Sequence, residues 1–236
     1  MGDSRNDLSS DSRNEKRASI PHLRAAGPMI VARVRARGAQ TARVTVLFAD
    51  LRGYTALAEQ LPAARVVPLL HEFFKVLNLA TAEFGGEVFH MAGDGIMAGF
   101  GVRTASSDGA SDALAAGHAI LNNFAPIAAR WRNDLAIESG IGIGLHLGEV
   151  ALGAFGPPRR KSTTLIGDTV NVAARLCGRA RAGEVLFSCT VAAALAERTK
   201  DDTSARPYLQ LPQFELRGRR EPIDIWCVPA AERLAL

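Results

Sequence analysis

Two aspartates carry most of the chemistry that this sequence offers. Asp50 follows a largely apolar run and belongs to the segment 48–55, Phe-Ala-Asp-Leu-Arg-Gly-Tyr-Thr. Asp94 stands between two glycines in the segment 92–100. An unpaired carboxylate is too costly to bury in a core, so each side chain is expected at a site rather than among apolar residues. Two carboxylates on neighbouring strands form an oxygen site suited to Mg²⁺ or Mn²⁺, which also bind substrate phosphates. The pair therefore indicates phosphoryl or nucleotidyl transfer rather than hydrolysis of sugars or peptides.

The elements that must position these aspartates alternate between strands and helices. Apolar periodicity, glycine stops and turn signals predict strands at 43–51, within 87–100 on either side of a turn at Gly93-Asp94-Gly95, within 137–152, and at 184–187, 208–217 and 222–228. The same signals predict helices at 62–84, 111–131, 169–179 and 191–197. This alternation predicts one α/β or α+β domain with helices packed on a sheet.

The charge distribution separates a tail from the folded part. The chain carries 28 Lys and Arg against 24 Asp and Glu, and its whole excess of +4 lies in residues 1–40. We therefore expect a flexible basic tail at 1–40, a folded domain at 41–230 and a short C-terminal tail at 231–236. Within the tail, residues 29–37 fit either a short strand or docking arm, or a solvated basic linker, which is favoured. The neutral domain predicts no nucleic-acid partner.

Cysteine usage and hydropathy bear on the compartment. The three cysteines, Cys177, Cys189 and Cys227, are scattered and show neither metal-ligand spacing nor a disulfide framework. This usage favours the reducing cytoplasm. No apolar run approaches the roughly 18 residues of a transmembrane helix, so no membrane span is expected.

Five segments together resemble one known family. Besides the two aspartate segments, they are residues 142–150, 165–175 and 214–218. In this order the sequence is similar to the catalytic domain of class III nucleotidyl cyclases, the adenylate and guanylate cyclase family, from about residue 41 to 228. The resemblance implies an α+β fold with a ferredoxin-like, palm-type sheet and helices packed on it. It also implies attack of a ribose 3′-OH on the α-phosphate of a nucleoside triphosphate, with release of pyrophosphate.

The resemblance assigns the first half of a site to the aspartate segments. It implies that Asp50, Asp94 and the backbone carbonyl of Leu51 bind two divalent cations, Mg²⁺ or Mn²⁺. Two such ions lower the pKa of the attacking hydroxyl and neutralise developing charge. Backbone N–H groups from Arg52 through Gly53 to Tyr54 are expected to meet phosphate oxygens, helped by the N-terminus of a following helix.

The second half of the site lies later in the chain. Asn171 and Arg175 are four residues apart and share one face of the predicted helix. By resemblance, Asn171 orients the ribose and Arg175 stabilises the pentavalent phosphate, which suits a guanidinium fork. Arg217 is expected to grip the terminal phosphates, with Arg219 or Arg220 as alternatives. Because family members complete each site with a second domain, a chain with one domain is expected to form a head-to-tail homodimer with two interfacial sites.

The position that would read the base departs from the family pattern. The residue four before the second aspartate is Lys in most adenylate cyclases and Glu in guanylate cyclases, but here it is His90, and its expected partner is Thr164. A neutral histidine donates one hydrogen bond and accepts one, so it suits the edge of adenine or the smaller edge of a pyrimidine. His90 is also compatible with a structural role that makes no base contact.

Several functions are compatible with these residues. Conversion of ATP to cyclic AMP in signal transduction leads, because ATP is the most frequent substrate in the family. A guanylate cyclase, or a pyrimidine cyclase like the bacterial relatives that make cyclic CMP or cyclic UMP in antiviral (antiphage) defence, is the alternative within the class. A non-catalytic cyclase-homology module that binds a nucleotide or a partner domain is the alternative from another class.

Overall fold

The computed structural model describes residues 40–103, 108–157, 159, 161–198, 208–215 and 221–228. Their helices and strands follow one another in this order: β1 (Gln40–Arg52), α2 (Tyr54–Gln60), α3 (Ala63–Glu83), β2 (Glu87–Ala92), β3 (Gly95–Phe100), α4 (Ala110–Leu135), β4 (Gly140–Phe155), β5 (Ser162–Ile166), α5 (Asp168–Arg179), β6 (Glu184–Ser188), α6 (Cys189–Arg198), β7 (Leu209–Phe214) and β8 (Ile223–Val228). Apart from Gln40, which begins β1, the predicted tails, including residues 29–37, lie outside this part of the chain.

The strands form one mixed sheet. Its order is β2-β3-β1-β4-β6-β8-β7, and β5 pairs with β4 beside this path. Strand β1 is antiparallel to both β3 and β4, whereas β4 and β6 are parallel. The run β1-α3-β2-β3-α4-β4, with β4 and β3 on either side of β1, has the connectivity of a ferredoxin-like βαββαβ unit. The α+β class expected from the sequence is confirmed.

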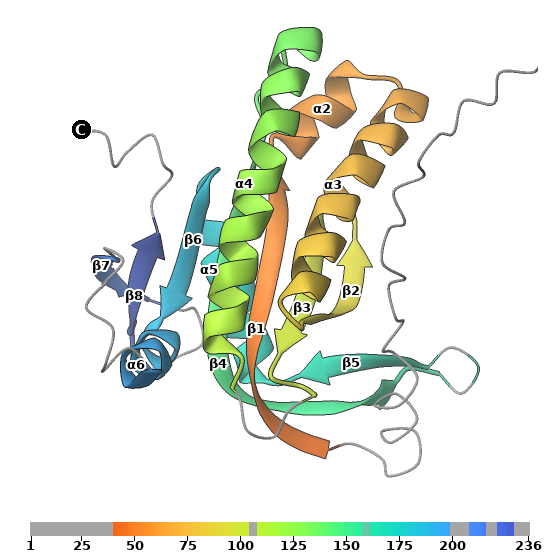
Figure 1. The fold of residues 1–236 in the computed structure, drawn as a ribbon. Coiled ribbons are helices and arrows are strands. Elements are labelled where there is room, and N and C mark those ends of the chain that lie inside the picture. The colour runs from red at the N-terminus through yellow and green to blue at the C-terminus, as the bar shows by residue number, and fades with distance from the viewer. Residues whose placement is uncertain are drawn as a thin grey trace, which may run out of the picture.

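Helices cover both faces of the sheet (Figure 1). On one face, Leu47, Ala49 and Leu51 of β1 belong to a core that also takes residues from α3, α4 and α6. On the other face, Val44 and Val46 pack with residues from β4, β5 and α5. Because successive side chains of a strand alternate between faces, the even-numbered residues of β1, which include Asp50, belong to the α5 side.

Most predicted elements are present with small shifts in their ends. The turn at Gly93-Asp94 and the long helices α3 and α4 are confirmed. Two elements were missed, namely α2 and β5, which have only seven and five residues. The strands predicted within 137–152 are instead one strand of 16 residues, β4, which continues past β1 to pair with β5. The described residues of the predicted strand at 208–217 form β7.

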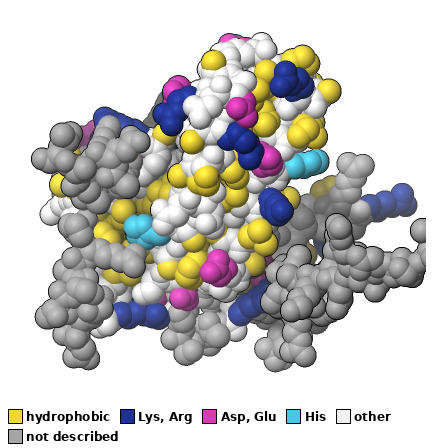
Figure 2. All heavy atoms as spheres, turned by 45° about the horizontal axis from the view of Figure 1, so that its top comes forward, with side chains coloured by type: hydrophobic (Ala, Val, Ile, Leu, Met, Phe, Trp, Pro, Cys, Tyr) yellow, Lys and Arg dark blue, Asp and Glu magenta, His cyan; other side chains and the backbone are white. Residues whose placement is uncertain are grey.

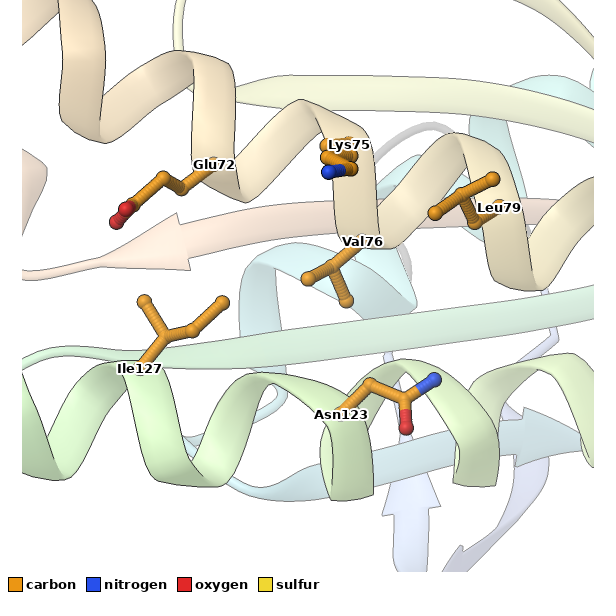
Figure 3. A pocket seen from close by; sticks show the side chains of 6 residues that line it. All are labelled: Glu72, Lys75, Val76, Leu79, Asn123 and Ile127. Atoms are coloured by element: carbon orange, nitrogen blue, oxygen red, sulfur yellow. The ribbon is translucent and has the colours of Figure 1, made fainter. Parts of the chain in front are cut away.

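The helical face carries a cleft away from the aspartates. It lies between α3 and α4, has a volume of about 330 Å³, and is lined by Glu72, Lys75, Val76, Leu79, Asn123 and Ile127 (Figure 3). Arg130 forms an ion pair with Glu72 beside it. Figure 2 shows basic and acidic side chains interspersed with apolar ones over the face in view, without a patch of one sign. This distribution agrees with the neutral charge balance of the folded part.

Candidate active site

Asp50 lies near the end of β1, on the face of the sheet that α5 covers. In the sheet it is opposite Gly95 of β3 on one side and Gly142 of β4 on the other. Its side chain is 37% exposed, so solvent reaches the carboxylate. The sequence prediction that this carboxylate stays out of the core is therefore confirmed.

Asp94 occupies the turn between β2 and β3 and lies beside Asp50. The backbone N–H of Leu51 donates a hydrogen bond of 2.9 Å to the carbonyl of Asp94, which ties the end of β1 to the turn. Gly93 permits the turn with a positive φ of 58°. Burial raises the pKa of Asp50, the Arg52 guanidinium opposes that rise, and the Asp94 carboxylate adds to it. The fold thus brings two mutually repelling carboxylates together at one end of the sheet.

The segment after Asp50 makes a tight turn into α2. Gly53 has a φ of 85°, and a Cβ there would lie 2.2 Å from the carbonyl oxygen of Glu138, so only glycine fits. The first N–H groups of α2, from Tyr54 onward, lack acceptors within the helix. Helix α2 has only seven residues, so its dipole adds little to the anion binding expected here. Any contact to phosphate would come from the N–H groups themselves.

The side chain of Arg52 takes part in the candidate site, whereas the sequence predicted a role only for its backbone N–H. Its Nη1 donates to the Asp50 carboxylate, its Nη2 donates to the carbonyl oxygen of Cys177, and its Nε donates to the carbonyl oxygen of Ala180 at 3.0 Å. The signal in the sequence was the spacing, because residues two apart on a strand point to the same face. What the sequence did not show was that the end of α5 lies next to them.

Helix α5 presents Asn171 and Arg175 on its outer face. Both residues are exposed, whereas Val172 and Leu176 are buried against the sheet. The predicted helix and the shared face of the two residues are confirmed. The two side chains thus face outward from α5, while Asp50 lies on the sheet near the C-terminal end of that helix, to which Arg52 connects it.

Glycines of β4 let α5 pack directly on the strand. A Cβ at Gly144 would lie 2.1 Å from the backbone nitrogen of Cys177 and 2.4 Å from the carbonyl oxygen of Ala173. The Cys177 thiol itself donates to the carbonyl of Gly142 at 3.3 Å. Backbone therefore packs on backbone at this point, and any side chain at position 144 would push the helix that carries Asn171 away from β4.

The two candidate base-reading residues lie on strands at the edge of the fold. His90 is exposed on β2 and follows a bulge at residue 89, where the register with β3 shifts. Thr164 is half-buried on β5, opposite Gly153 of β4. In Figure 1, β5 lies at the end of the sheet remote from the end of β1 and the β2–β3 turn. Arg217, Arg219 and Arg220 fall outside the described residues.

Comparison with known proteins identifies the family. The family model of the adenylate and guanylate cyclase catalytic domain matches residues 37–228. The chain belongs to this family. It is 33% identical over 215 residues to an adenylate cyclase of Anabaena cylindrica, an alignment that covers 86% of this chain and 40% of that protein. The chain thus spans well under half the length of this curated relative.

Solved cyclase structures share the fold. The adenylyl cyclase CyaB of P. aeruginosa superposes with a TM-score of 0.75 at 27% identity, covering 83% of this chain and 97% of that one. The guanylyl cyclase Cya2 gives a TM-score of 0.70 at 27% identity and covers 84% and 98%. Cyclases named for different purines are therefore similar to this chain to about the same degree.

The carboxylate pair of this cyclase domain fits a divalent cation. Asp50 is half-buried, and both its burial and the neighbouring Asp94 raise its pKa, so a cation between the two would relieve charge repulsion. Within the described ranges, no group of three or more His, Cys, Asp or Glu side chains gathers as a metal site. The chain therefore offers two carboxylates and nearby backbone carbonyls, which suits ions that draw further ligands from water and substrate phosphates.

The length and hydropathy of the helices decide whether any of them could span a membrane. Of those that the structure describes, none combines the length and the apolar character that a bilayer-spanning helix requires.

Proposed function

We propose that this chain is a nucleotide cyclase that converts a nucleoside triphosphate to a 3′,5′-cyclic nucleotide and pyrophosphate. The ribose 3′-oxygen forms a bond to the α-phosphorus, the bond from that phosphorus to the bridging oxygen of the β-phosphate breaks, and the hydroxyl proton is released. Pyrophosphate departs with the electrons of the broken bond.

The observation that carries the proposal is the juxtaposition of Asp50 and Asp94 within a chain that belongs to the cyclase family.

The aspartates would hold the metal ions of the reaction. Asp50, Asp94 and the Leu51 carbonyl are the proposed ligands for two ions, Mg²⁺ or Mn²⁺. When bound, such ions supply a lowered pKa for the attacking hydroxyl and positive charge for the triphosphate. The half-burial of Asp50 beside Asp94 supports this role, because it holds negative charge where a cation would stabilise it.

The remaining roles concern the triphosphate and the ribose. Backbone N–H groups from Arg52 to Tyr54 are proposed donors to phosphate oxygens, and Arg217 is the proposed partner of the terminal phosphates. Asn171 would orient the ribose, and Arg175 would stabilise the extra negative charge at the α-phosphate. Arg175 suits that charge because a guanidinium offers two parallel donors in one plane.

Two copies of the chain would complete each site. Asn171 and Arg175 are exposed on the outer face of α5, whereas the carboxylates lie at the end of the sheet. A head-to-tail homodimer would place α5 of one protomer over the aspartates of its partner and create two equivalent sites. Analytical ultracentrifugation with nucleotide and Mn²⁺ tests this arrangement, since a fully active monomer would contradict it.

ATP is the proposed substrate, and His90 with Thr164 are the proposed base contacts. The adenylate cyclase of Anabaena cylindrica and the adenylyl cyclase of P. aeruginosa support ATP. The guanylyl cyclase Cya2, at a comparable TM-score, keeps GTP as an alternative. Position 90 holds an exposed histidine instead of the lysine or glutamate of the common patterns, so CTP and UTP are alternative substrates as well.

One experiment tests both the reaction and the base. Purified protein is incubated with Mn²⁺ and, separately, ATP, GTP, CTP and UTP, and the products are identified by mass spectrometry. We expect cyclic AMP from the intact chain and none from Asp94→Ala, with both proteins giving the same circular dichroism spectrum. Equal product from the variant would refute the assigned role of the carboxylate pair.

A binding module without catalysis is the second candidate. It would bind a nucleotide in the presence of Mn²⁺, by calorimetry, while forming no cyclic product from any of the four triphosphates. The presence of Asn171 and Arg175 in addition to Asp50 and Asp94 favours the enzyme, because a module that only binds a nucleotide through a cation does not need a guanidinium to stabilise charge at the α-phosphate.

A further inference from the structure

We propose that Arg52 is a positioning residue that fixes the Asp50 carboxylate relative to the C-terminal end of α5. It would thereby link the metal-binding half of the chain to the helix that carries Asn171 and Arg175. The inference rests on the proposed function for its catalytic consequence. The link itself, in which one guanidinium joins the end of a strand to the end of a helix, follows from the hydrogen bonds of Arg52.

Three hydrogen bonds give Arg52 this role. The guanidinium donates to the Asp50 carboxylate through Nη1, to the Cys177 carbonyl through Nη2 and to the Ala180 carbonyl through Nε, the last at 3.0 Å. The side chain is only 26% exposed, so little solvent competes for these donors. A planar fork that bonds three acceptors at once has a single orientation, and its hydrogen bond to one oxygen of the Asp50 carboxylate restricts where that carboxylate points.

The strand between Arg52 and α5 is built to let the side chain pass. Arg52 belongs to β1, and β4 separates β1 from β6 in the sheet. A Cβ at Gly142 of β4 would lie 2.5 Å from Nη2 and 2.7 Å from Nε of Arg52. Any residue other than glycine would displace the guanidinium. The absence of a side chain at Gly142 therefore opens the path by which Arg52 reaches α5.

The acceptors on α5 belong to its last turn. Helix α5 ends at Arg179, and Ala180 is its capping residue. The Cys177 carbonyl also accepts the backbone N–H of Ala180 at 3.0 Å, so the guanidinium is its second donor. Carbonyls at a helix C-terminus carry partial negative charge, and a cation there stabilises the helix end. Cys177 lies two residues after Arg175. Arg52 thus holds the turn from which Arg175 projects, at the same time as it holds Asp50.

Substitution by lysine separates geometry from charge. Arg52→Lys keeps the positive charge but replaces the planar fork by one ammonium, which cannot bond the same three acceptors. The matched control is Arg130→Lys, because Arg130 pairs with the Glu72 carboxylate on the α3–α4 face, remote from the aspartates. Arg52→Gln serves as a second variant should the lysine protein fail to fold.

Two measurements on the full chain report on the two ends of the link. Hydrogen exchange of residues 177–183 reports on the end of α5, and calorimetric titration with Mn²⁺ reports on the carboxylate pair. For Arg52→Lys we expect amide exchange about tenfold faster at the end of α5, since hydrogen bonds to a charged donor are lost. We expect Mn²⁺ affinity to fall about tenfold, as happens when the residue that orients a metal ligand is replaced.

The outcomes separate this inference from the proposed function. Arg130→Lys should change neither measurement, and global unfolding by denaturant should show both variants folded. Wild-type exchange and affinity in Arg52→Lys would overturn the inference. Faster exchange with unchanged Mn²⁺ affinity would also overturn it, because Arg52 would then cap α5 without positioning Asp50. If the wild-type chain made no cyclic product while both changes appeared, the proposed function would fail and the link would stand.

Discussion

Replacing Gly144 by alanine would place a methyl carbon inside the backbone of α5. The added Cβ would lie 2.1 Å from the nitrogen of Cys177 and 2.4 Å from the carbonyl oxygen of Ala173. Neither atom belongs to a flexible side chain, so the contact can be relieved only by moving the helix or the strand. To restore van der Waals separation, α5 would have to retreat by roughly 1 Å or more.

The cost of this retreat follows from what the helix buries. Val172, Ala173, Leu176 and Cys177 all lie in the interface and would lose contacts together. Overpacking of this kind destabilises folded proteins by about 1–3 kcal/mol. If α5 completes the site as proposed, a displacement of about 1 Å also lowers turnover by on the order of 100-fold.

Gly178 provides the matched control on the same helix. A Cβ there meets nothing within 4 Å, so Gly178→Ala adds only helix propensity. We expect this variant to gain about 0.5–1 kcal/mol in the free energy of unfolding. Urea unfolding followed by circular dichroism compares both variants with the wild type. A Gly144→Ala protein that unfolds at the wild-type urea concentration would refute the direct packing of α5 on β4.

Three further predictions concern the base, the buried thiol and its titration. His90→Lys should raise the proportion of cyclic AMP among products from an equimolar mixture of the four triphosphates; an unchanged product profile would rule out base contact by His90. In the folded protein iodoacetamide should label half-buried Cys189 well before buried Cys177, as peptide mass spectrometry would show, because burial raises the pKa of the Cys177 thiol from 9.0 to about 12. This raised pKa favours the neutral thiol in the folded state, so its contribution to stability is complete below pH 9 and declines as the pH rises toward 12. The free energy of unfolding should therefore fall by about 1 kcal/mol more between pH 9 and 10 in the wild type than in Cys177→Ser, and equal slopes would contradict the assigned pKa.

The long, strongly patterned elements were predictable from the sequence. Helices α3 and α4 repeat apolar residues at helical spacing over many turns, so local pattern and tertiary packing agree. Strand β5, Ser162–Ile166, has no such repeat and owes its conformation to pairing with the extension of β4. Helix α2 is too short for periodicity to show and depends on the turn at Gly53.

The site was predictable in its residue types but not in its internal contacts. The spacing of Asp50 and Asp94 around glycine turns was enough to indicate a carboxylate pair. The side chain of Arg52 was not assigned, because its acceptors at Cys177 and Ala180 are more than 120 residues away in sequence. The glycines of β4 were visible as a pattern, but their purpose depends on which helix lies over them.

The edge position of the base-reading candidates has a consequence for how such a domain changes specificity. Strand β2 is an edge strand of the sheet, His90 is exposed on it, and β5 pairs with β4 alone among the described strands. A longer side chain at exposed position 90 can extend into solvent, whereas a side chain at Gly144 would collide with the backbone of α5. If His90 contacts the base as proposed, selection or engineering could exchange the recognised nucleobase by substituting one exposed residue without disturbing the carboxylate pair. Base preference would then diverge faster than mechanism among descendants of one such chain.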